Sequence, residues 1–401
     1  MFESAGIGGQ PVRPPGARGR QLALIVAAAI LILVTAGVIT AVATNRADPP
    51  RASWRGAPAA DVRTETPAAG PTSQPPTPAD ETISLSATGD IVMGDAPGAL
   101  PPNGGKGFFD GVKRALAADL VMGNLEEPIT EDTGHVKCSP GSTSCHQFRV
   151  PPGYAAHLRD GGFGLLNTAN NHAYDFGAQG HTNTRHALEQ YGLRHTGDPD
   201  EITVVNVNRV RVAVLGFSSY SWSNSLIDLA EARAVVQRAA TLADLVVVQV
   251  HMGGEGTDRT HVRPGTETFL GENRGDPIKF AHTVIDAGAD LVVGHGPHVM
   301  RALEFYRGRL IAYSLGNFAG GGGTLAATGV LGYGGVLKVS LHRDGRWASG
   351  SVTATTHQNG GLPRLDAANR SITLLRSLCA ADFPATGARL GPAGEISPAK
   401  P

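Results

Sequence analysis

Short runs rich in Val, Ile and Leu alternate with amphipathic stretches from residue 81 onward, and this alternation limits the fold more than any other feature. The apolar runs cover residues 83–87, 120–123, 164–168, 211–216, 245–250, 291–294 and 310–315. The amphipathic stretches between several of them cover residues 108–118, 178–191, 226–242 and 277–287. Near-continuous apolar runs predict strands buried on both faces, and their alternation with helices predicts a layered α/β domain.

Three short turns predict hairpins between some of these strands. They lie at residues 207–209, 307–309 and 343–345, and the last of them contains Asp344-Gly345 between apolar runs at 336–342 and 347–354. Asp-Gly is a favoured hairpin turn, because both of its residues accept a positive φ. A mixed sheet, or two packed sheets flanked by helices, therefore fits the pattern better than a purely parallel sheet.

An uncharged apolar stretch at residues 22–43 precedes this region. As a helix rising ~1.5 Å per residue it would span about 33 Å, enough to cross a hydrocarbon core of ~30 Å. Arg13, Arg18 and Arg20 precede it, so the positive-inside rule predicts a cytoplasmic segment at 1–21 and export of the remainder. We expect a single-pass membrane protein with an extracytoplasmic domain. Ala41-Val42-Ala43 also matches a signal-peptidase site, and secretion after cleavage near Ala43 is the alternative.

Two segments outside the alternating region hold few core-forming side chains. Residues 47–81 combine Pro, Ala, Thr and Ser, and residues 384–401 are similar in character. Such segments bury too little apolar surface to offset the entropy cost of ordering. We predict a disordered Pro/Ala-rich linker, a single domain over residues 82–383, and a disordered tail.

Composition excludes several classes of protein. Lys+Arg 34 against Asp+Glu 35 gives a net charge of −1, which argues against a nucleic-acid partner. Three cysteines are too few for a disulfide scaffold or a Cys-rich zinc site. Cys138 and Cys145 flank a Gly/Ser loop in the segment predicted to be exported, so we expect them to form a disulfide and Cys379 to stay free. The sequence contains no G-x-S-x-G elbow, P-loop or H-E-x-x-H motif.

Side chains that can bind a metal follow five of the predicted strands. They are Asp90, Glu126, Asn171 with His172, His251, and His295 with His298. Ligands of open α/β sheets bind outside the carboxyl ends of the strands, so these side chains are predicted to meet in one crevice. Carboxylate oxygen with neutral imidazole nitrogen suits Mn, Fe or Zn better than Ca or Mg. A bridging carboxylate can hold two such ions ~3.5–4 Å apart, and we expect one or two divalent ions.

Each of these residues alone also has an ordinary structural interpretation. Asp90 could cap a helix or form a turn, His251 could be a hydrogen-bonded core histidine, and the GHGPH segment could be a surface turn. The coincidence of all of them at strand ends favours a metal site. Asp175 lies three residues after His172 and is predicted to orient its imidazole, and Glu255 is predicted to line the pocket, with a surface or capping role as the alternative for each. The histidines outside strand ends are predicted to be structural or exposed: His135, His146, His181, His186, His261 and His282.

Six segments carry a resemblance to a known family. TGDIVMGD, NLEEPIT, TANNHAYDFG, VHMGGE, DAGADLVVGHGPHV and LIAYSLGNF resemble, in order, the bacterial CapA family of capsule and poly-γ-glutamate biosynthesis proteins, over about residues 82–358. The domain of that family is similar to the calcineurin-like metallophosphoesterases, which have a four-layered α/β/β/α sandwich of mixed sheets and a two-metal site. The phosphoesterase pattern begins Asp-x-His, whereas this chain has Val92 two residues after Asp90.

The resemblance implies a role for each candidate residue. It makes His172 the proton donor and gives the metal to the following side chains: Asp90, Glu126, Asn171, His251, His295 and His298. Asn124 is a further candidate for the substrate pocket. It further implies a membrane-anchored protein that supports the synthesis, transport or attachment of an anionic polymer such as polyglutamate, as a metal-dependent hydrolase or transferase. Two alternatives stay open, a non-catalytic accessory subunit of a membrane synthase complex and a metal-dependent phosphodiesterase.

Overall fold

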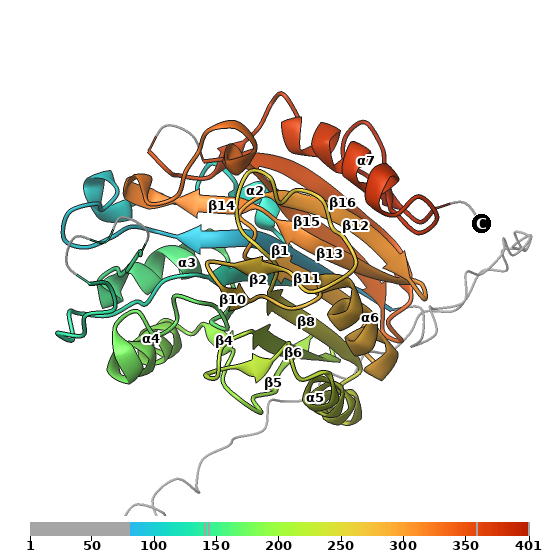
Figure 1. Ribbon diagram of the computed structural model, residues 1–401, viewed down its shortest axis with the longest axis horizontal. Helices are drawn as coiled ribbons and strands as arrows, with labels where there is room; N and C mark the ends of the chain where they lie inside the picture. The colour runs from blue at the N-terminus through green and yellow to red at the C-terminus, as the bar shows by residue number, and fades with distance from the viewer. Residues whose placement is uncertain (1–80, 140–141, 143–144, 358–359, 400–401) are drawn as a thin grey trace, which may run out of the picture. The chain divides into compact units, whose positions relative to one another are not determined.

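The computed structural model describes residues 81–139, 142, 145–357 and 360–399 (Figure 1). The predicted cytoplasmic segment, the predicted anchor at 22–43 and residues 47–80 of the predicted linker lie outside this part of the chain. Within the described residues, no helix has the length and apolar character needed to cross a membrane.

The first sheet is mixed and has β1 near its middle. The strand order is β17-β16-β15-β1-β2-β3-β4, and β14 pairs with the carboxyl end of β1. The strands from β1 to β4 run parallel to one another, whereas β15, β16 and β17 are antiparallel to their neighbours. The bounds are β1 Thr82–Val92, β2 Leu120–Leu125, β3 Leu165–Asn167, β4 Arg194–Thr196, β14 Asn317–Gly320, β15 Tyr333–His342, β16 Trp347–Thr356 and β17 Arg364–Leu365.

The second sheet is also mixed, with the order β12-β13-β11-β8-β6-β5 and β7 paired with β6. Its inner strands β6, β8, β11 and β13 are parallel, and the outer strands β5 and β12 are antiparallel to their neighbours. The bounds are β5 Thr203–Val207, β6 Val210–Ser218, β7 Asn224–Ser225, β8 Leu245–His251, β11 Leu291–His295, β12 Met300–Tyr306 and β13 Arg309–Leu315. The three predicted hairpin turns join β5 to β6, β12 to β13 and β15 to β16, which confirms the expected mixed sheets.

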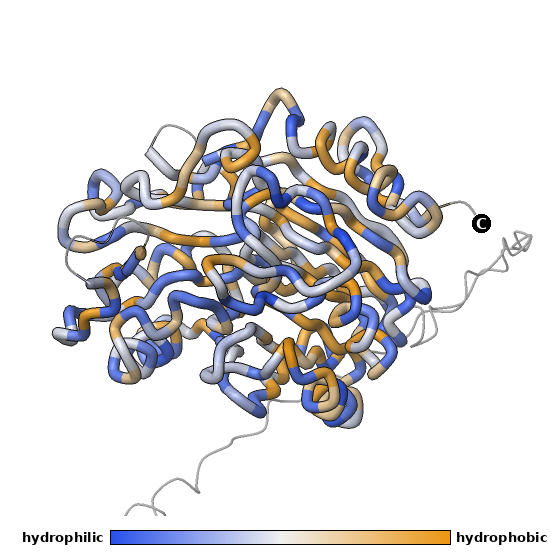
Figure 2. Tube along the Cα trace, in the orientation of Figure 1, coloured by the Kyte–Doolittle hydropathy of each residue, from blue (hydrophilic) through white to orange (hydrophobic). Residues whose placement is uncertain are grey.

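Alternation along β2 shows how the layers are arranged. Leu120 and Met122 pack into a core shared with the second sheet, whereas Val121 and Leu125 pack against the helices on the opposite face of the first sheet. Those helices are α2 Lys113–Leu116, α3 Ala155–Gly161 and α4 Gly177–Gln190, while α5 Leu229–Leu242 and α6 Pro277–Ala287 contact the second sheet. Helix, sheet, sheet and helix layers therefore follow one another, and Figure 2 shows the hydrophobic residues gathered along the central strands.

The segment predicted as a helix over 108–118 is helical only in α2. Gly105 and Gly107, just before it, have positive φ of 77° and 73°, so the chain turns here. Phe108 and Phe109 are each 2% exposed and pack into the core from this turn. The apolar spacing thus reflects a buried turn and one short helix.

The C-terminal segment, predicted to be disordered from residue 384, is ordered through residue 399. It forms the hairpin of β18 Arg389–Leu390 and β19 Ile396–Ser397 next to α7 Arg370–Asp382. The N–H of Ala388 donates to the carbonyl of Leu303 in β12 at 2.9 Å, and the N–H of Val352 in β16 donates to Gly394 at 2.9 Å. A few backbone hydrogen bonds to the two sheets fix a segment whose composition alone predicts disorder.

Candidate metal site

Four of the predicted ligands lie at the carboxyl ends of parallel strands, two in each sheet. Asp90 lies near the end of β1 and Glu126 directly follows β2, while His251 and His295 are the last residues of β8 and β11. The strand register places His251 beside His295. Because the two sheets pack face to face, their strand ends bring the carboxylates and the imidazoles together.

Asp90, Glu126 and His251 form the centre of this group. Each offers one ligand atom, and the three atoms lie within 4.8 Å of one another. All three side chains are at most 1% exposed. Both carboxylate oxygens of Glu126 and both ring nitrogens of His251 lack a hydrogen-bond partner among the described residues. Uncompensated burial of polar groups costs free energy, so these atoms fit a site completed by a cation.

The electrostatics of these residues follow from burial. Burial raises the pKa of Glu126 well above its usual value and lowers the pKa of His251 well below its usual value. Burial also raises the pKa of Asp90, but the hydrogen bond from His298 and the nearby imidazoles together hold it below the usual range. His251 is therefore neutral at pH 7, as an imidazole ligand must be.

His298 adjoins both carboxylates. Its Nδ1 lies 3.2 Å from Asp90 Oδ2 and 2.8 Å from Asn317 Oδ1, and its Nε2 lies 3.5 Å from Glu126 Oε1. Burial lowers the pKa of His298, but the negative charges of Glu126 and Asp90 raise it well above its usual value overall. The residue has φ of 59°, a conformation that is uncommon outside glycine, and Gly296 has φ of 107°. This tight loop aims the imidazole back at the strand ends.

His295 faces the same carboxylate from the other side. Its Nδ1 lies 3.8 Å from Asp90 Oδ1, and its Nε2 lies 3.2 Å from Gln249 Oε1. When Nε2 carries the proton and donates it to Gln249 Oε1, the lone pair of Nδ1 points toward the site. There Nδ1 has no hydrogen-bond partner in the described structure. Burial lowers the pKa of His295 to about 4.

The two adjacent asparagines have different surroundings. The Nδ2 of Asn170 donates to Asn124 Oδ1 at 3.1 Å and to the Leu125 carbonyl at 2.9 Å. The Oδ1 of Asn171 is buried and finds no partner in the part of the chain that the structure describes, as expected of a ligand atom. Asn124 was expected to line the substrate pocket, but it is fully buried and its Nδ2 donates to Asp90 Oδ1 at 2.9 Å. The amide of Asn124 therefore orients the carboxylate of Asp90.

His172 and Asp175 form a hydrogen-bonded pair. The Nδ1 of His172 lies 2.7 Å from Asp175 Oδ2, so the proton on Nδ1 donates to the carboxylate and Nε2 is the second nitrogen of the ring. The other partner of this oxygen is the N–H of Phe148, at 2.8 Å. Burial lowers the pKa of His172, and the charge of Asp175 partly opposes that effect.

Glu255 lies at the edge of the group, where its side chain is 15% exposed. Its Oε2 is 3.7 Å from His298 Nε2, and its Oε1 accepts a hydrogen bond of 2.6 Å from Arg274. The guanidinium of Arg274 lies over the rings of Tyr220 and Phe269, at 5.6 and 5.5 Å from their centroids. Arg274 was not among the site residues predicted from the sequence.

The three cysteines are arranged as the sequence predicts. Cys138 and Cys145 are joined by a disulfide, and Cys379 is a buried free thiol. Val92, at the position of the histidine in Asp-x-His, is fully buried.

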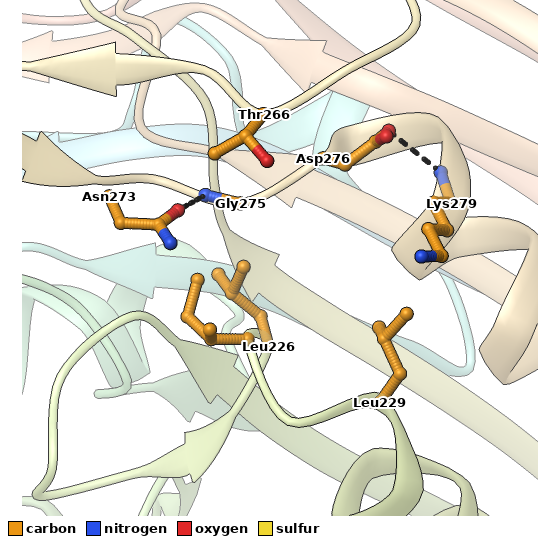
Figure 3. Close-up of a pocket in the computed structure, with 8 residues that line it drawn as sticks. Leu226, Leu229, Thr266, Asn273, Gly275, Asp276 and Lys279 are labelled. Carbon is orange, nitrogen blue, oxygen red and sulfur yellow. Dashed lines mark hydrogen bonds between the residues drawn. The ribbon is translucent and has the colours of Figure 1, made fainter.

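A pocket lies between the start of α5 and the segment from 266 to 279 (Figure 3). It is lined by Leu226, Ile227, Leu229, Thr266, Asn273, Gly275, Asp276 and Lys279. Among the described residues that line it, none belongs to the predicted site. This pocket is therefore separate from the candidate site at the strand ends.

This geometry defines the class of the protein. It is a two-sheet α/β domain with buried carboxylates and imidazoles at its strand ends. The chain belongs to the family of the bacterial capsule synthesis protein PGA_cap, whose family model matches residues 84–321, more than half of the chain.

Curated relatives agree with this family. The PGA biosynthesis protein CapA of Bacillus subtilis is 31% identical over 261 residues, which cover 60% of this chain and 63% of that protein. The capsule biosynthesis protein CapA of Bacillus anthracis is 30% identical over 262 residues, 60% of each chain. A probable polyglutamine synthesis accessory protein of Mycobacterium tuberculosis is 31% identical over 228 residues, 50% of this chain and 55% of that protein. The match spans between about half and two thirds of the length of these relatives.

Two solved structures overlap this chain loosely. A putative 5'-nucleotidase from Staphylococcus aureus has a TM-score of 0.39 at 12% identity, covering 74% of this chain and 58% of its own. A 5'-nucleotidase precursor from Thermus thermophilus has a TM-score of 0.39 at 13% identity, covering 76% and 60%.

Proposed function

We propose that this protein is a metal-dependent hydrolase or transferase that acts on an anionic surface polymer such as poly-γ-glutamate. The observation that carries the proposal is the buried group of Asp90, Glu126 and His251, whose ligand atoms converge within 4.8 Å. Membership of the capsule synthesis family supports the polymer as the substrate class.

The candidate ligands of one or two divalent ions include that group. They are Asp90, Glu126, Asn171, His251, His295 and His298. An ion bound there would supply Lewis acidity and activate water near neutral pH. Mn, Fe and Zn suit this mixed oxygen and nitrogen set. Asn124 fixes the orientation of Asp90, and Gln249 fixes the tautomer of His295.

His172 completes the proposed reaction as the proton donor. Asp175 holds the Nδ1 proton, so Nε2 of the protonated ring can give its proton to the leaving group. In hydrolysis of a γ-amide, the oxygen of water bonds to the carbonyl carbon as the carbon–nitrogen bond breaks. The leaving nitrogen takes the proton from His172 and departs as an amine, and the proton that the attacking water loses restores the protonated ring of His172.

Membrane attachment through residues 22–43, with the domain outside the cytoplasm, is part of the proposal, and so is contact with a membrane synthase complex. The supporting observation is the uncharged stretch preceded by three arginines. Carbonate extraction of cell membranes tests the attachment. An anchored protein stays in the membrane pellet, whereas release with a new N-terminus near residue 43 would indicate a secreted protein.

Metal analysis and turnover of the purified full-length chain test the enzyme. We expect bound Mn, Fe or Zn and cleavage of γ-linked glutamate polymer, and we expect both to be lost in His251→Ala. His186→Ala, on the exposed side of α4, is the matched control and should change neither. A chain without transition metal, with His251→Ala equal to the wild type, would contradict the proposal.

A non-catalytic accessory subunit is the second candidate. Val92 at the position of the missing imidazole favours it, and so does the similarity to the probable polyglutamine synthesis accessory protein of M. tuberculosis. An accessory subunit would act only when partner membranes are added, and His251→Ala would then leave polymer yield unchanged. Turnover of a chromogenic phosphodiester in the same assay would identify a phosphodiesterase.

A further inference from the structure

The two stretches of chain that flank the disulfide of Cys138 and Cys145 both contact Asp175. Lys137, which precedes Cys138, donates through Nζ to Asp175 Oδ1. Phe148, which follows Cys145 by three residues, donates its backbone N–H to Asp175 Oδ2 at 2.8 Å. The disulfide therefore links two stretches of chain, and each of them hydrogen-bonds one carboxylate oxygen of Asp175.

Gln147 and Lys137 extend these contacts to the backbone. The Nε2 of Gln147 donates to the carbonyl of Asp175 at 2.8 Å, and its Oε1 accepts the N–H of Lys137 at 3.2 Å. The Nζ of Lys137 also donates to the carbonyl of Asn171 at 3.3 Å. Lys137 thus bridges the start and the end of the turn from Asn171 to Asp175, in which His172 lies.

Asp175 and Phe148 orient the imidazole of His172. Asp175 Oδ2 accepts the Nδ1 proton of His172 at 2.7 Å, and the ring of Phe148 lies 4.7 Å from the imidazole ring. Asp175 is fully buried, whereas the side chain of Lys137 is 30% exposed. Hydrogen bonds to Asp175, Asn171 and Gln147 hold Lys137 at this position, and the disulfide of the neighbouring Cys138 links it to the stretch of chain that carries Gln147 and Phe148.

We propose that Lys137, Gln147 and Phe148, which lie on either side of the disulfide, form a clamp for the proton donor, that Lys137 is a positioning residue within it, and that reduction of the disulfide loosens the clamp. The inference rests on the proposed role of His172 and adds the residues that fix its geometry. Without Lys137 the buried carboxylate of Asp175 loses the ion-pair partner of its Oδ1, so that only the N–H of Phe148, on Oδ2, still holds it toward His172. The proposed proton transfer then lacks an oriented imidazole.

Two variants of the full-length chain test the clamp, Lys137→Met and the double variant Cys138→Ser/Cys145→Ser. With an amide substrate, whose leaving nitrogen needs a proton, we expect kcat to fall about tenfold or more with KM nearly unchanged. With a p-nitrophenyl ester, whose leaving group departs without a proton, kcat should change less than about twofold. Lys137→Arg, which keeps the charge, should recover part of the loss. Equal losses on both substrates would show a general structural defect and overturn the proposal.

Lys279→Met is the matched control, because Lys279 lines the separate pocket of Figure 3. It should behave as the wild type on both substrates. A thiol reductant should lower the amide kcat of the wild type to that of the double cysteine variant and should not affect the double variant. Full amide activity of the reduced wild type would contradict a role for the disulfide.

NMR of the Nδ1 proton of His172 separates the clamp from the enzyme proposal. The signal, assigned by its absence in His172→Gln, should be observed in the wild type and in Lys279→Met. It should be lost to exchange in Lys137→Met and in the double cysteine variant. A protein with no turnover but with this pattern would refute the proposed enzyme and keep the clamp. An unchanged signal in both clamp variants would refute the clamp itself.

Discussion

Glu126 shows at the scale of one residue how a binding site lowers the stability of the fold. It is 1% exposed, and neither of its carboxylate oxygens has a hydrogen-bond partner in the described structure. A soluble protein rarely buries a carboxylate in this way unless a cation or a proton compensates it. The imidazoles of His298 and His251 lie 3.5 and 3.9 Å from Glu126 Oε1, and the residue fits the candidate metal site.

The first prediction is that Glu126→Gln stabilises the metal-free protein. Removing a buried carboxylate that no hydrogen bond satisfies should raise the free energy of unfolding in EDTA by about 1 kcal/mol, measured by urea denaturation. The same variant should lose the rise in Tm that Mn or Zn gives to the wild type. Glu131→Gln, at an exposed position, is the control and should change neither quantity. A less stable Glu126→Gln protein that still responds to metal would show that Glu126 is structural.

Residue-scale prediction from sequence works where strand geometry gives the answer. The rule that parallel strands end at one edge of a sheet indicates Asp90, Glu126, His251 and His295, and the structure brings these four together. Arg274 gives no such signal, because its partner Glu255 is 19 residues away and is reached only through the path of the intervening loops.

Glycines control the close approach of the strands at the element scale. A Cβ on Gly89, one residue before Asp90, would lie 1.8 Å from the carbonyl oxygen of Gly316. The N–H of Asp90 donates to this same oxygen at 3.0 Å. Any side chain at position 89 must therefore push β1 away from the second sheet, and Asp90 moves with it.

The second prediction follows for Gly89→Ala. It should lower the free energy of unfolding by more than about 2 kcal/mol, because backbone and not a flexible side chain opposes the new methyl group. Metal content should fall in the fraction that remains folded. Gly98→Ala, where no atom lies within 4 Å of the added Cβ, is the matched control. Chemical denaturation and metal analysis of both variants decide the point, and equal stability of the two would contradict it.

The third prediction concerns β4, where His195 lies between two carboxylates. Its Nε2 is 3.1 Å from Glu189 Oε1 and its Nδ1 is 3.4 Å from Glu201 Oε1. Burial alone would lower the pKa of His195, but Glu201 and Glu189 raise it overall. The stabilisation is then fully present below the unfolded pKa of about 6.5 and is lost as pH rises through the folded pKa.

His195→Gln should remove this dependence. Urea denaturation from about pH 5.5 to about pH 8.5 should show that the stability difference between wild type and variant shrinks as pH rises. A difference that is constant, or that grows with pH, would exclude the assigned ion pairs. His186→Gln, on the exposed face of α4, serves as the control.

Element boundaries are predictable where the local signals are complete. The helix expected over 277–287 is α6, with Pro277 in its first turn, the side chain of Asp276 accepting from the N–H of Lys279 at 3.0 Å, and Gly288 ending it at φ of 118°. The tail lacks such signals, because β18 and β19 are fixed by hydrogen bonds to strands that lie far away in the sequence.

At the scale of the whole described domain, the tail connects the two sheets. It accepts from β16 of the first sheet at Gly394 and donates to β12 of the second at Ala388. Ala388 and Ile396 are only 4% and 6% exposed. The site depends on how the two sheets pack, so a segment far from the metal ligands contributes to their alignment.

The fourth prediction is that a chain ending at residue 383 is less stable and binds metal more weakly. Loss of two buried apolar side chains and several backbone hydrogen bonds should cost about 3 kcal/mol or more. Removal of only the last four residues should have no effect. Thermal unfolding with and without Mn measures both quantities, and a truncated chain equal to the full chain would show that the tail is dispensable.

The division of the ligands between two sheets also has a consequence in time. Asp90 and Glu126 are synthesised long before His251, and the pair of histidines in Gly-His-Gly-Pro-His emerges later still. A partly made chain holds the acidic groups of the candidate site without the imidazoles that would complete it. Cation uptake at the proposed site would therefore require that most of the polypeptide has been synthesised and folded.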